Sequence, residues 1–381
     1  MRLVSRTLEQ IAPPVGTVAD LRGERPDVLD AAQGAPSYPT APSIVARIRE
    51  VAAHPDGGRY TDGRGLPALR ASLAEDLSRD YAAGIDSESI LITAGCNQAF
   101  CLSASALAEK GDEVVLTTPF YFNHDMWVRL DGLIPVHVET SPDTGQVSVD
   151  DVARAVTPRT RMIVIASPGN PTGVGASPEV LEGLADLARD RELVLVLDET
   201  YRVFRGSSAP AHHLFTRPDW HEYFVSLHSF SKDFAIPGYR VGAIVGSPRL
   251  LDEVMKLMDC VAICAPRIGQ EAALEGLRSA SGWRSDRVAE VHHKHDVFRA
   301  AFADAPGGFD LRLSGGFYGW VRHPGVGADT TEIVRRLAVE SGVLAIGGDV
   351  FTPADDGFIR LSFANLELTE IDELVRRLAA F

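Results

Sequence analysis

The chain of 381 residues has few lysines, only four cysteines and no long apolar run. Its longer apolar runs, such as residues 260–265, fall far short of the roughly 20 residues that a membrane-spanning helix needs. Basic residues are outnumbered, 37 against 52 acidic ones, which leaves a net charge of −15. This deficit argues against a nucleic-acid or membrane partner, because such surfaces need a basic patch. The first residues hold no apolar stretch long enough for a secretory signal, so we expect a cytoplasmic protein.

The cysteines are too few and too widely spaced for a metal or redox motif. They lie at positions 96, 101, 260 and 264, and neither neighbouring pair has the Cys-x-x-Cys spacing of a zinc or thiol–disulfide site. We therefore expect buried or free thiols and no metal centre.

Lysine is scarce, and arginine supplies nearly all of the positive charge. The four lysines are Lys110, Lys232, Lys256 and Lys294. Because lysine can lose its proton and become an amine nucleophile whereas arginine cannot, a lysine in a Ser-rich apolar setting suggests a chemical role. Lys232 has such a setting. Lys294 lies in the run His292–His295 on a long polar helix, where we expect a solvated face rather than a metal site.

The order of apolar segments predicts an α/β protein. The composition, 45% apolar and 23% charged, is that of a globular chain with about two domains. Strand-like runs alternate with amphipathic helices, two of which begin at Ser177-Pro178 and Ser247-Pro248, and this alternation is typical of a mostly parallel sheet covered by helices. The predicted strands are 90–93, 113–117, 135–139, 162–166, 193–197, 225–228 and 242–245.

The pattern changes after about residue 266. A long helical stretch over 270–303 precedes two short strands, and two helices flank the second strand, which together indicate a smaller α+β unit. We predict a large domain over 45–270 and a small domain built from 1–44 and 271–381. The predicted strands of the small domain are 317–322 and 358–363, and its helices are 331–341 and 369–380.

The segment around Lys232 has the composition of a phosphate site beside an amine. Ser229 and Ser231 come just before the lysine, and Arg240 follows eight residues later. Hydroxyls and a guanidinium can hold a dianion, while the lysine forms an imine with an aldehyde on the same ligand. Taken alone, this segment also fits an exposed loop with a solvated lysine.

Two upstream motifs make the pattern specific. Asp198 ends a buried strand and is followed by Tyr201, and Asn170 lies in the turn-rich segment 167–173. Singly, Asp198 would fit a helix N-cap and Asn170 a turn. Together with the Lys232 segment they resemble the class I and II (fold type I) pyridoxal-phosphate aminotransferases, and the resemblance covers nearly the whole chain.

This resemblance implies pyridoxal 5′-phosphate as cofactor, held by Lys232 as a Schiff base. It assigns the cofactor's phosphate to Ser229, Ser231 and Arg240. It also implies that Asn170 and Tyr201 bond the phenolic oxygen and that Asp198 pairs with the pyridine nitrogen. A carboxylate at that place favours the protonated ring, which withdraws electrons from the substrate.

Further cofactor contacts follow from the same resemblance. A strand–helix junction matches the part of the phosphate site that a helix N-terminus provides; its residues are Gly95, Cys96 and Asn97. Tyr121 matches the aromatic residue that stacks on the ring. His124, three residues on, either supports Asp198 or lies on the surface, and the sequence leaves both open.

The substrate side rests on fewer residues. Arg360 interrupts an apolar strand, where an inward arginine needs an anionic partner, and the resemblance assigns it the substrate α-carboxylate, beside Asn170. Gly34 matches a loop that closes over the substrate. Tyr60 matches a tyrosine that reaches the neighbouring subunit's cofactor, which implies a homodimer with shared active sites. The role of Arg267 stays open.

The expected activity is transfer of the amino group of an L-amino acid to a 2-oxo acid, a reaction of amino-acid metabolism. One alternative is another pyridoxal-phosphate reaction on the same site, namely β-elimination, decarboxylation or amino-acid oxidation. A second is a regulatory or binding protein on this scaffold, which would need an added DNA-binding segment. The sequence does not identify the substrate side chain.

Overall fold

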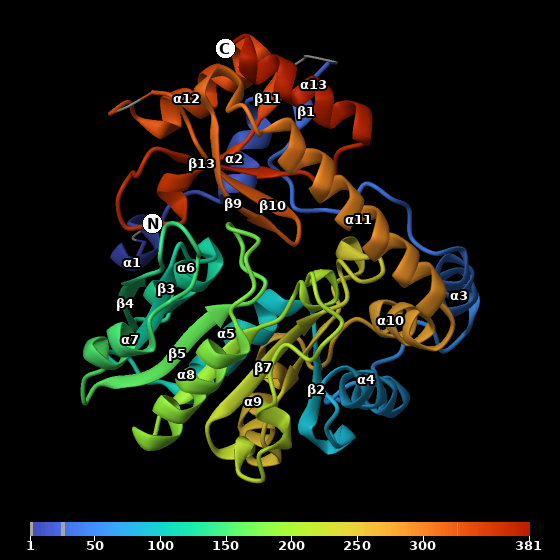
Figure 1. Ribbon diagram of the computed structural model, residues 1–381. Coiled ribbons are helices and arrows are strands. Elements are labelled where there is room, and N and C mark those ends of the chain that lie inside the picture. The colour runs from blue at the N-terminus through green and yellow to red at the C-terminus, as the bar shows by residue number, and fades with distance from the viewer. Residues whose placement is uncertain (1–2, 24–26, 326) are drawn as a thin grey trace.

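A seven-stranded sheet forms the centre of the larger part of the molecule (Figure 1). The computed structural model describes residues 3–23, 27–325 and 327–381. The strand order is β2-β8-β7-β6-β5-β3-β4, in which β8 runs antiparallel to both neighbours and the other pairs are parallel. This confirms the predicted α/β class. The strands are β2 (Ile90–Thr93), β3 (Glu113–Thr118), β4 (Ile134–Glu139), β5 (Thr160–Ala166), β6 (Val194–Asp198), β7 (Phe224–Ser229) and β8 (Gly242–Val245).

Helices cover both faces of this sheet because alternate strand residues are apolar on opposite sides. Ile90 and Ile92 pack in one buried cluster and Leu91 in another. The predicted N-caps form, since the hydroxyls of Ser177 and Ser247 accept backbone N–H bonds. The first face carries α3 (Pro42–Ala53), α4 (Pro67–Asp80), α7 (Val149–Ala155), α8 (Pro178–Asp190) and α10 (Arg267–Ser279); the second carries α5 (Cys96–Leu107), α6 (Phe122–Leu130) and α9 (Pro248–Val261).

The smaller part of the molecule has its own sheet and its own apolar core. Four antiparallel strands lie in the order β12-β13-β10-β9, and the N-terminal strand β1 pairs with β11. Both chain ends therefore contribute to this core, although the exact boundaries at 44/45 and 270/271 stay a prediction. The elements are α1 (Ser5–Leu8), α2 (Pro14–Asp20), β1 (Leu29–Asp30), α11 (Ser281–Ala301), β9 (Asp310–Gly315), β10 (Tyr318–Arg322), α12 (Thr330–Arg336), β11 (Val343–Leu344), β12 (Ile346–Gly347), β13 (Phe358–Ser362) and α13 (Leu368–Ala379).

Two expectations for the C-terminal part are corrected by the structure. The stretch 270–303 is not one helix, because the chain turns at Ala280 between α10, which packs on α3 and α4, and α11, which packs on α13. The run His292–His295 is only partly a solvated face, since His293 is exposed but Lys294 is not. Lys294 is buried and its amine donates to Ser37 Oγ at 2.7 Å, because α11 turns this side toward the core of the smaller part.

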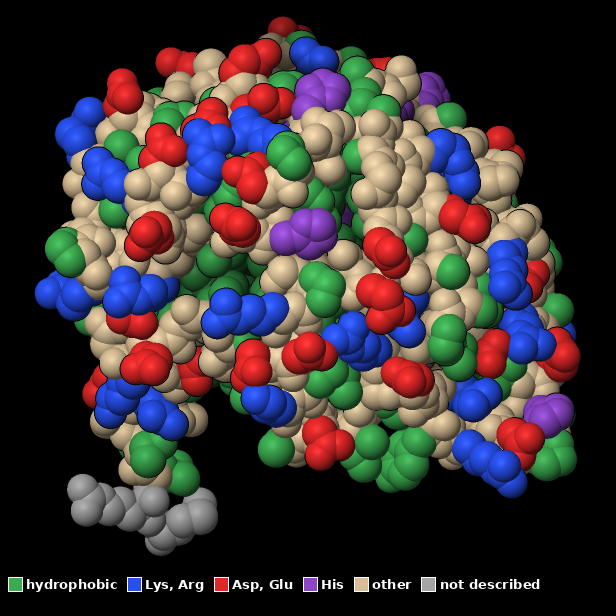
Figure 2. Space-filling model, turned by 90° about the horizontal axis from the view of Figure 1, so that it is seen from below, with side chains coloured by type: hydrophobic (Ala, Val, Ile, Leu, Met, Phe, Trp, Pro, Cys, Tyr) green, Lys and Arg blue, Asp and Glu red, His purple; other side chains and the backbone are tan. Residues whose placement is uncertain are grey.

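The surface fits the acidic composition of the chain. Basic and acidic side chains are interspersed over the face seen in Figure 2. Within the described ranges, no helix combines the length and the apolar character needed to cross a bilayer. All four cysteines, each of them described, are free thiols as expected.

Candidate active site

The predicted site residues gather where the strand ends meet. The carboxyl ends of β2, β3, β5, β6 and β7 lie at one edge of the sheet, because these strands all run in the same direction. Open α/β sheets bind their ligands at this edge. Asp198 is the last residue of β6 and Ser229 the last of β7, while Tyr121 and Asn170 follow β3 and β5.

A cavity of about 220 Å³ opens at this edge, below the smaller sheet. Twelve of the residues predicted from the sequence line it. They are Gly34, Cys96, Asn97, Tyr121, Asn170, Asp198, Tyr201, Ser229, Ser231, Lys232, Arg240 and Arg360. Two predicted residues lie outside the lining. Gly95 caps the start of α5 directly beside Arg240, and Tyr60 is 72% exposed.

Lys232 points its amine into the cavity, where it donates to the carbonyl of Gly34. Burial lowers the pKa of Lys232 to about 8, and the nearby charges of Arg360 and Arg240 act in the same direction. The interpretation as a solvated loop lysine is therefore wrong. A buried amine with this pKa is partly unprotonated near neutral pH and available as a nucleophile or base.

Asp198 is held ionised by its neighbours. Burial raises the pKa of Asp198, but the hydrogen bond and charge of His124, together with Thr200, outweigh burial and hold it below its usual range. His124 Nε2 lies 3.2 Å from Asp198 Oδ2, and the backbone N–H of Thr200 donates to Oδ1 at 3.0 Å. His124 is itself buried, so of the two interpretations, a surface histidine or a support for Asp198, the structure favours the second.

The end of the cavity at the start of α5 combines backbone, hydroxyl and guanidinium donors. Gly95 begins α5 with φ of +90°, and a Cβ there would overlap the Arg240 guanidinium. Arg240 is fixed by the carbonyls of Ala94, at 3.2 Å, and Pro237, at 2.9 Å. Ser229 and Ser231 are buried nearby. A helix N-terminus beside hydroxyls and an arginine suits a dianionic phosphate group.

Arg360 lies at the opposite wall and is 2% exposed. Its Nη1 donates to Asn170 Oδ1 at 2.8 Å and its Nη2 to the carbonyl of Ala32. Its Nε has no partner among the described residues. The rings of Tyr318 and Phe351 lie against this guanidinium, but no carboxylate of the described residues pairs with it. A buried cation without an anionic partner is costly, and an incoming carboxylate would satisfy it.

The chain matches known proteins along its whole length. The family model for class I and II aminotransferases matches residues 26–378. This chain belongs to that family. An aspartate/prephenate aminotransferase of Thermus thermophilus is 30% identical over 378 residues, 96% of each chain. An aromatic aminotransferase of Arabidopsis thaliana is 29% identical over 99% of this chain and 95% of its own.

Solved structures give the same result for the fold of this aminotransferase. N-succinyldiaminopimelate aminotransferase from Mycobacterium tuberculosis superposes with a TM-score of 0.92 at 27% identity, covering all of both chains. Thermus thermophilus aspartate aminotransferase with maleate gives 0.90 at 28% identity, again over both whole chains. The predicted family and fold type are confirmed, and amino-group transfer is the activity, in preference to the other reactions considered.

Among the lining residues that were not predicted from the sequence, Tyr318 makes the closest contacts with predicted ones. Tyr318, on β10, places its hydroxyl 2.5 Å from that of Tyr201 and its ring centroid 4.6 Å from the Arg360 guanidinium. An aromatic residue in an apolar strand is typical of a protein core, so the local sequence does not indicate that Tyr318 lines the cavity. Only the pairing of β10 with β13 brings it beside Arg360.

Arg267, whose role was left open, lies away from the cavity lining. Its Nε donates to the carbonyl of Arg59 at 3.1 Å, next to the exposed Tyr60. Arg267 and Tyr60 are therefore neighbours on the outside of this chain. The site residues that the sequence assigned to one subunit come together here, and the one assigned to a partner subunit does not.

Proposed function

We propose that this aminotransferase holds pyridoxal 5′-phosphate on Lys232 and moves the amino group of an L-amino acid to a 2-oxo acid. One observation carries the proposal. The amine of Lys232, the carboxylate of Asp198 and the guanidinium of Arg360 face one buried cavity from three distant segments of the chain. Pyridoxal phosphate supplies an aldehyde for the amino group and a ring that accepts electrons from the α-carbon.

The residues present fit this cofactor from one end to the other. The start of α5, Ser229, Ser231 and Arg240 would hold the phosphate group. Asp198, kept ionised by His124, would hold the protonated ring nitrogen. The remaining ring contacts would come from Tyr121 on the face and from Asn170 and Tyr201 at the phenolic oxygen.

The protein's own groups would bind the substrate and move a proton. Arg360 would take the α-carboxylate, helped by Asn170, whose side chain already contacts it. Lys232, displaced by the incoming amino group, would remove the α-proton of the substrate and deliver it to a carbon of the cofactor. Its lowered pKa, near 8, leaves a usable fraction of the amine unprotonated at neutral pH.

We also propose that the active unit is a homodimer. Tyr60 is 72% exposed on its own chain, which fits a side chain that serves the phosphate site of a second copy. Arg267 lies beside it and would face the same partner. The cytoplasmic location stays a prediction.

Borohydride reduction followed by peptide mapping tests the cofactor assignment. With only four lysines in the chain, the expected result is a pyridoxyl adduct on Lys232 and on no other lysine. Lys294 is the strictest internal control, because it is also buried. An adduct on Lys294, or a Lys232→Ala variant that keeps the visible absorbance, would contradict the proposal.

Amino donors assayed with and without a 2-oxo acid test the transfer step. We expect a new amino acid to form only when the acceptor is present. Ammonia or peroxide released without amino transfer would assign a different reaction to the same site.

A further inference from the structure

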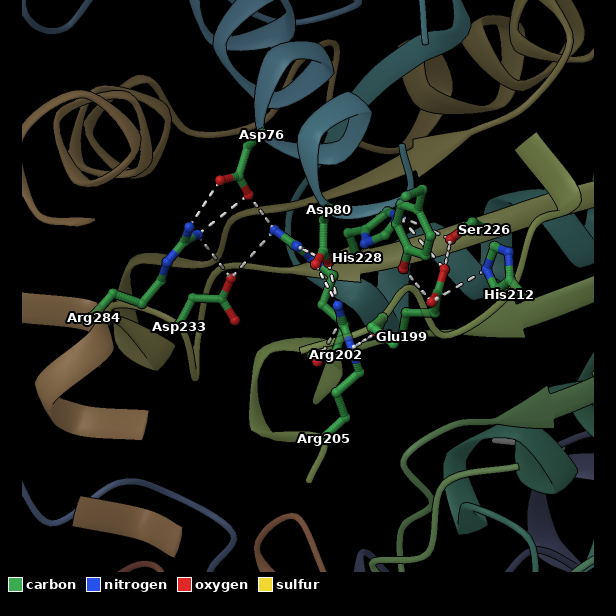
Figure 3. Close-up of polar contacts among 12 residues, drawn as sticks. Asp76, Asp80, Glu199, Arg202, Arg205, His212, Ser226, His228, Asp233 and Arg284 are labelled. Carbon is green, nitrogen blue, oxygen red and sulfur yellow. Dashed lines mark hydrogen bonds and ion pairs between the residues drawn. The ribbon is translucent and has the colours of Figure 1, made fainter. Parts of the chain in front are cut away.

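Outside the cavity lies a second group of charges, buried or partly buried and shown in Figure 3, which we call the rear network. Its members come from α4, from the 3-10 turn Arg202–Phe204, from the turn after β7 and from α11. They are Asp76, Asp80, Arg202, Asp233 and Arg284. The established reaction gives none of them a role.

Arg202 is the centre of the rear network. Its side chain is 5% exposed, its Nη1 donates to Asp80 Oδ2 at 2.8 Å, and its Nη2 donates to Asp76. The same Nη2 lies 3.9 Å from Asp233 Oδ2, and Arg284 approaches that oxygen to 4.0 Å. Asp233 thus joins a network that is anchored on α4.

The rear network is joined in sequence to the residues of the cavity. Tyr201 lines the cavity, and the next residue, Arg202, points away from it into the network. Lys232 also lines the cavity, and the next residue, Asp233, points away from it into the rear network. The two turns that carry Tyr201 and Lys232 are therefore connected to each other by one ion pair on their far sides.

The turn that carries Lys232 needs such support, because residues 231–235 lie in neither helix nor strand. The backbone N–H of Ile236 bonds the carbonyl of Ser231 at 3.1 Å across it. The hydroxyl of Thr40 donates to the carbonyl of Ala235 at 2.6 Å, but at Lys232 itself Tyr38 reaches the carbonyl only at 3.5 Å. A side-chain anchor next to Lys232 would remove much of its remaining freedom.

Stability alone gives no reason for a carboxylate at position 233. Burial raises the pKa of Asp233 to about 6, against the opposing charges of Arg202 and Arg284, and Asp76 and Asp80 raise it further. Its Oδ1 has no partner in the part of the chain that the structure describes. Asp233 is therefore ionised at neutral pH although its ionisation costs free energy of folding, which points to a role other than stabilising the fold.

We propose that Arg202 and Asp233 are positioning residues, whose ion pair fixes the Lys232 turn against the Tyr201 turn. The inference rests on the proposed roles of Lys232 and Tyr201 at the cofactor. Removing the pair changes no residue of the cavity lining but lets the Lys232 amine move relative to the Tyr201 hydroxyl.

The test compares Asp233→Asn with Glu113→Gln in the cofactor-loaded enzyme. Asn keeps the shape of the side chain and removes its charge. Glu113 is the matched control, a buried carboxylate paired with Arg159 at the far end of β3. The measurements are the pH midpoint of the visible absorbance of the lysine-bound cofactor, kcat, KM and the melting temperature.

For Asp233→Asn we expect the absorbance midpoint to shift by about 0.5 pH unit or more. We expect kcat to fall about tenfold with KM nearly unchanged, because the reacting amine is misplaced. The melting temperature should stay the same or rise. Glu113→Gln should lower the melting temperature and leave both the midpoint and kcat unchanged.

A wild-type midpoint and kcat in Asp233→Asn would overturn the inference, as would equal shifts in both variants. If Asp233→Asn fails to fold, Arg202→Lys replaces it, since one ammonium cannot reach Asp76, Asp80 and Asp233 together, and the same shift is expected. Failure of the proposed function is distinguishable, because the wild-type enzyme itself would then lack a cofactor band on Lys232.

Discussion

The cavity and the rear network are both buried and both charged, yet their charges are paired differently. In the rear network, Arg202 and Arg284 donate to the carboxylates of Asp76 and Asp80. In the cavity, Arg360 and Lys232 donate to neutral oxygens, and no carboxylate of the described residues pairs with either of them. The turns between the two therefore have cations without an anionic partner on one side and, apart from the loosely paired Asp233, hydrogen-bonded ion pairs on the other. The difference indicates that ligand binding acts at the front and rigidity is supplied from behind.

Loss of the amine at the front should have the largest effect. Lys232→Ala is expected to lower the rate of amino transfer by about 10⁴-fold or more, because the proposed covalent attachment and proton transfer would both depend on this group. Stopped-flow single turnovers measure it. Lys256→Ala, which removes a surface lysine paired with Glu253, should behave as wild type, and a Lys232→Ala enzyme with substantial activity would end the assignment.

Loss of a carboxylate of the rear network should instead lower the free energy of unfolding. Asp76→Asn leaves Arg202 and Arg284 without their shared partner, and breaking a buried ion pair costs about 3–5 kcal/mol. Urea unfolding measures the loss, with Glu253→Gln as the surface control. A loss below 1 kcal/mol would mean that the rear network is not the rigid side of the comparison.

The pH dependence of stability separates Asp233 from the rest of the rear network. Its pKa rises from 3.8 to about 6 on folding, so between these pH values the folded state binds more protons than the unfolded state. Stability from this group is present below pH 3.8 and is lost as the pH rises through 6, by about 3 kcal/mol for a shift of two units.

Urea unfolding of wild type and Asp233→Asn at pH 4 and pH 6.5 isolates this contribution. The stability of the variant relative to wild type should increase between the two pH values. A difference that is independent of pH would show that Asp233 is paired as fully as Asp76.

Removal of the unpaired cation at the front should change binding more than folding. Arg360→Met is expected to raise KM for the amino acid about a hundredfold, which is the loss of a buried charge-assisted pair to the carboxylate. Its free energy of unfolding should fall less than that of Asp76→Asn, because no carboxylate loses its partner. An equal loss of stability would contradict the division between the two sides.

The front side could be predicted from the sequence, and the back could not. Buried apolar runs predict the strands that Asp198 ends and that Lys232 and Asn170 follow. That these residues meet at one sheet edge then follows from the direction of the strands. The rear network depends on α4 crossing behind the turns, and neither Asp76 nor Asp80 differs in sequence from a solvated helix residue. Buried charge in a helix is visible only once its partners are placed.

The errors in the smaller part have the same origin. Ser281 and Gly282 weakly favour a helix end near Ala280, but the turn between α10 and α11 arises because the two helices pack on different cores. Tyr318 reads as core for the same reason. Local pattern predicts elements well where one face is buried, and poorly where contacts between distant segments decide the outcome.

The smallest effect concerns Tyr60, which we propose serves the site of a second copy. Tyr60→Ala should weaken cofactor binding about tenfold, the size of one lost hydrogen bond to a charged group. In a mixture with Lys232→Ala, a hybrid dimer would combine an intact Lys232 with a Tyr60 from the other copy. Cofactor titration should then show one tight site per hybrid, whereas Tyr60→Ala alone shows none. If affinity in the mixture is only the average of the two parents, Tyr60 serves its own chain and the sites are not shared.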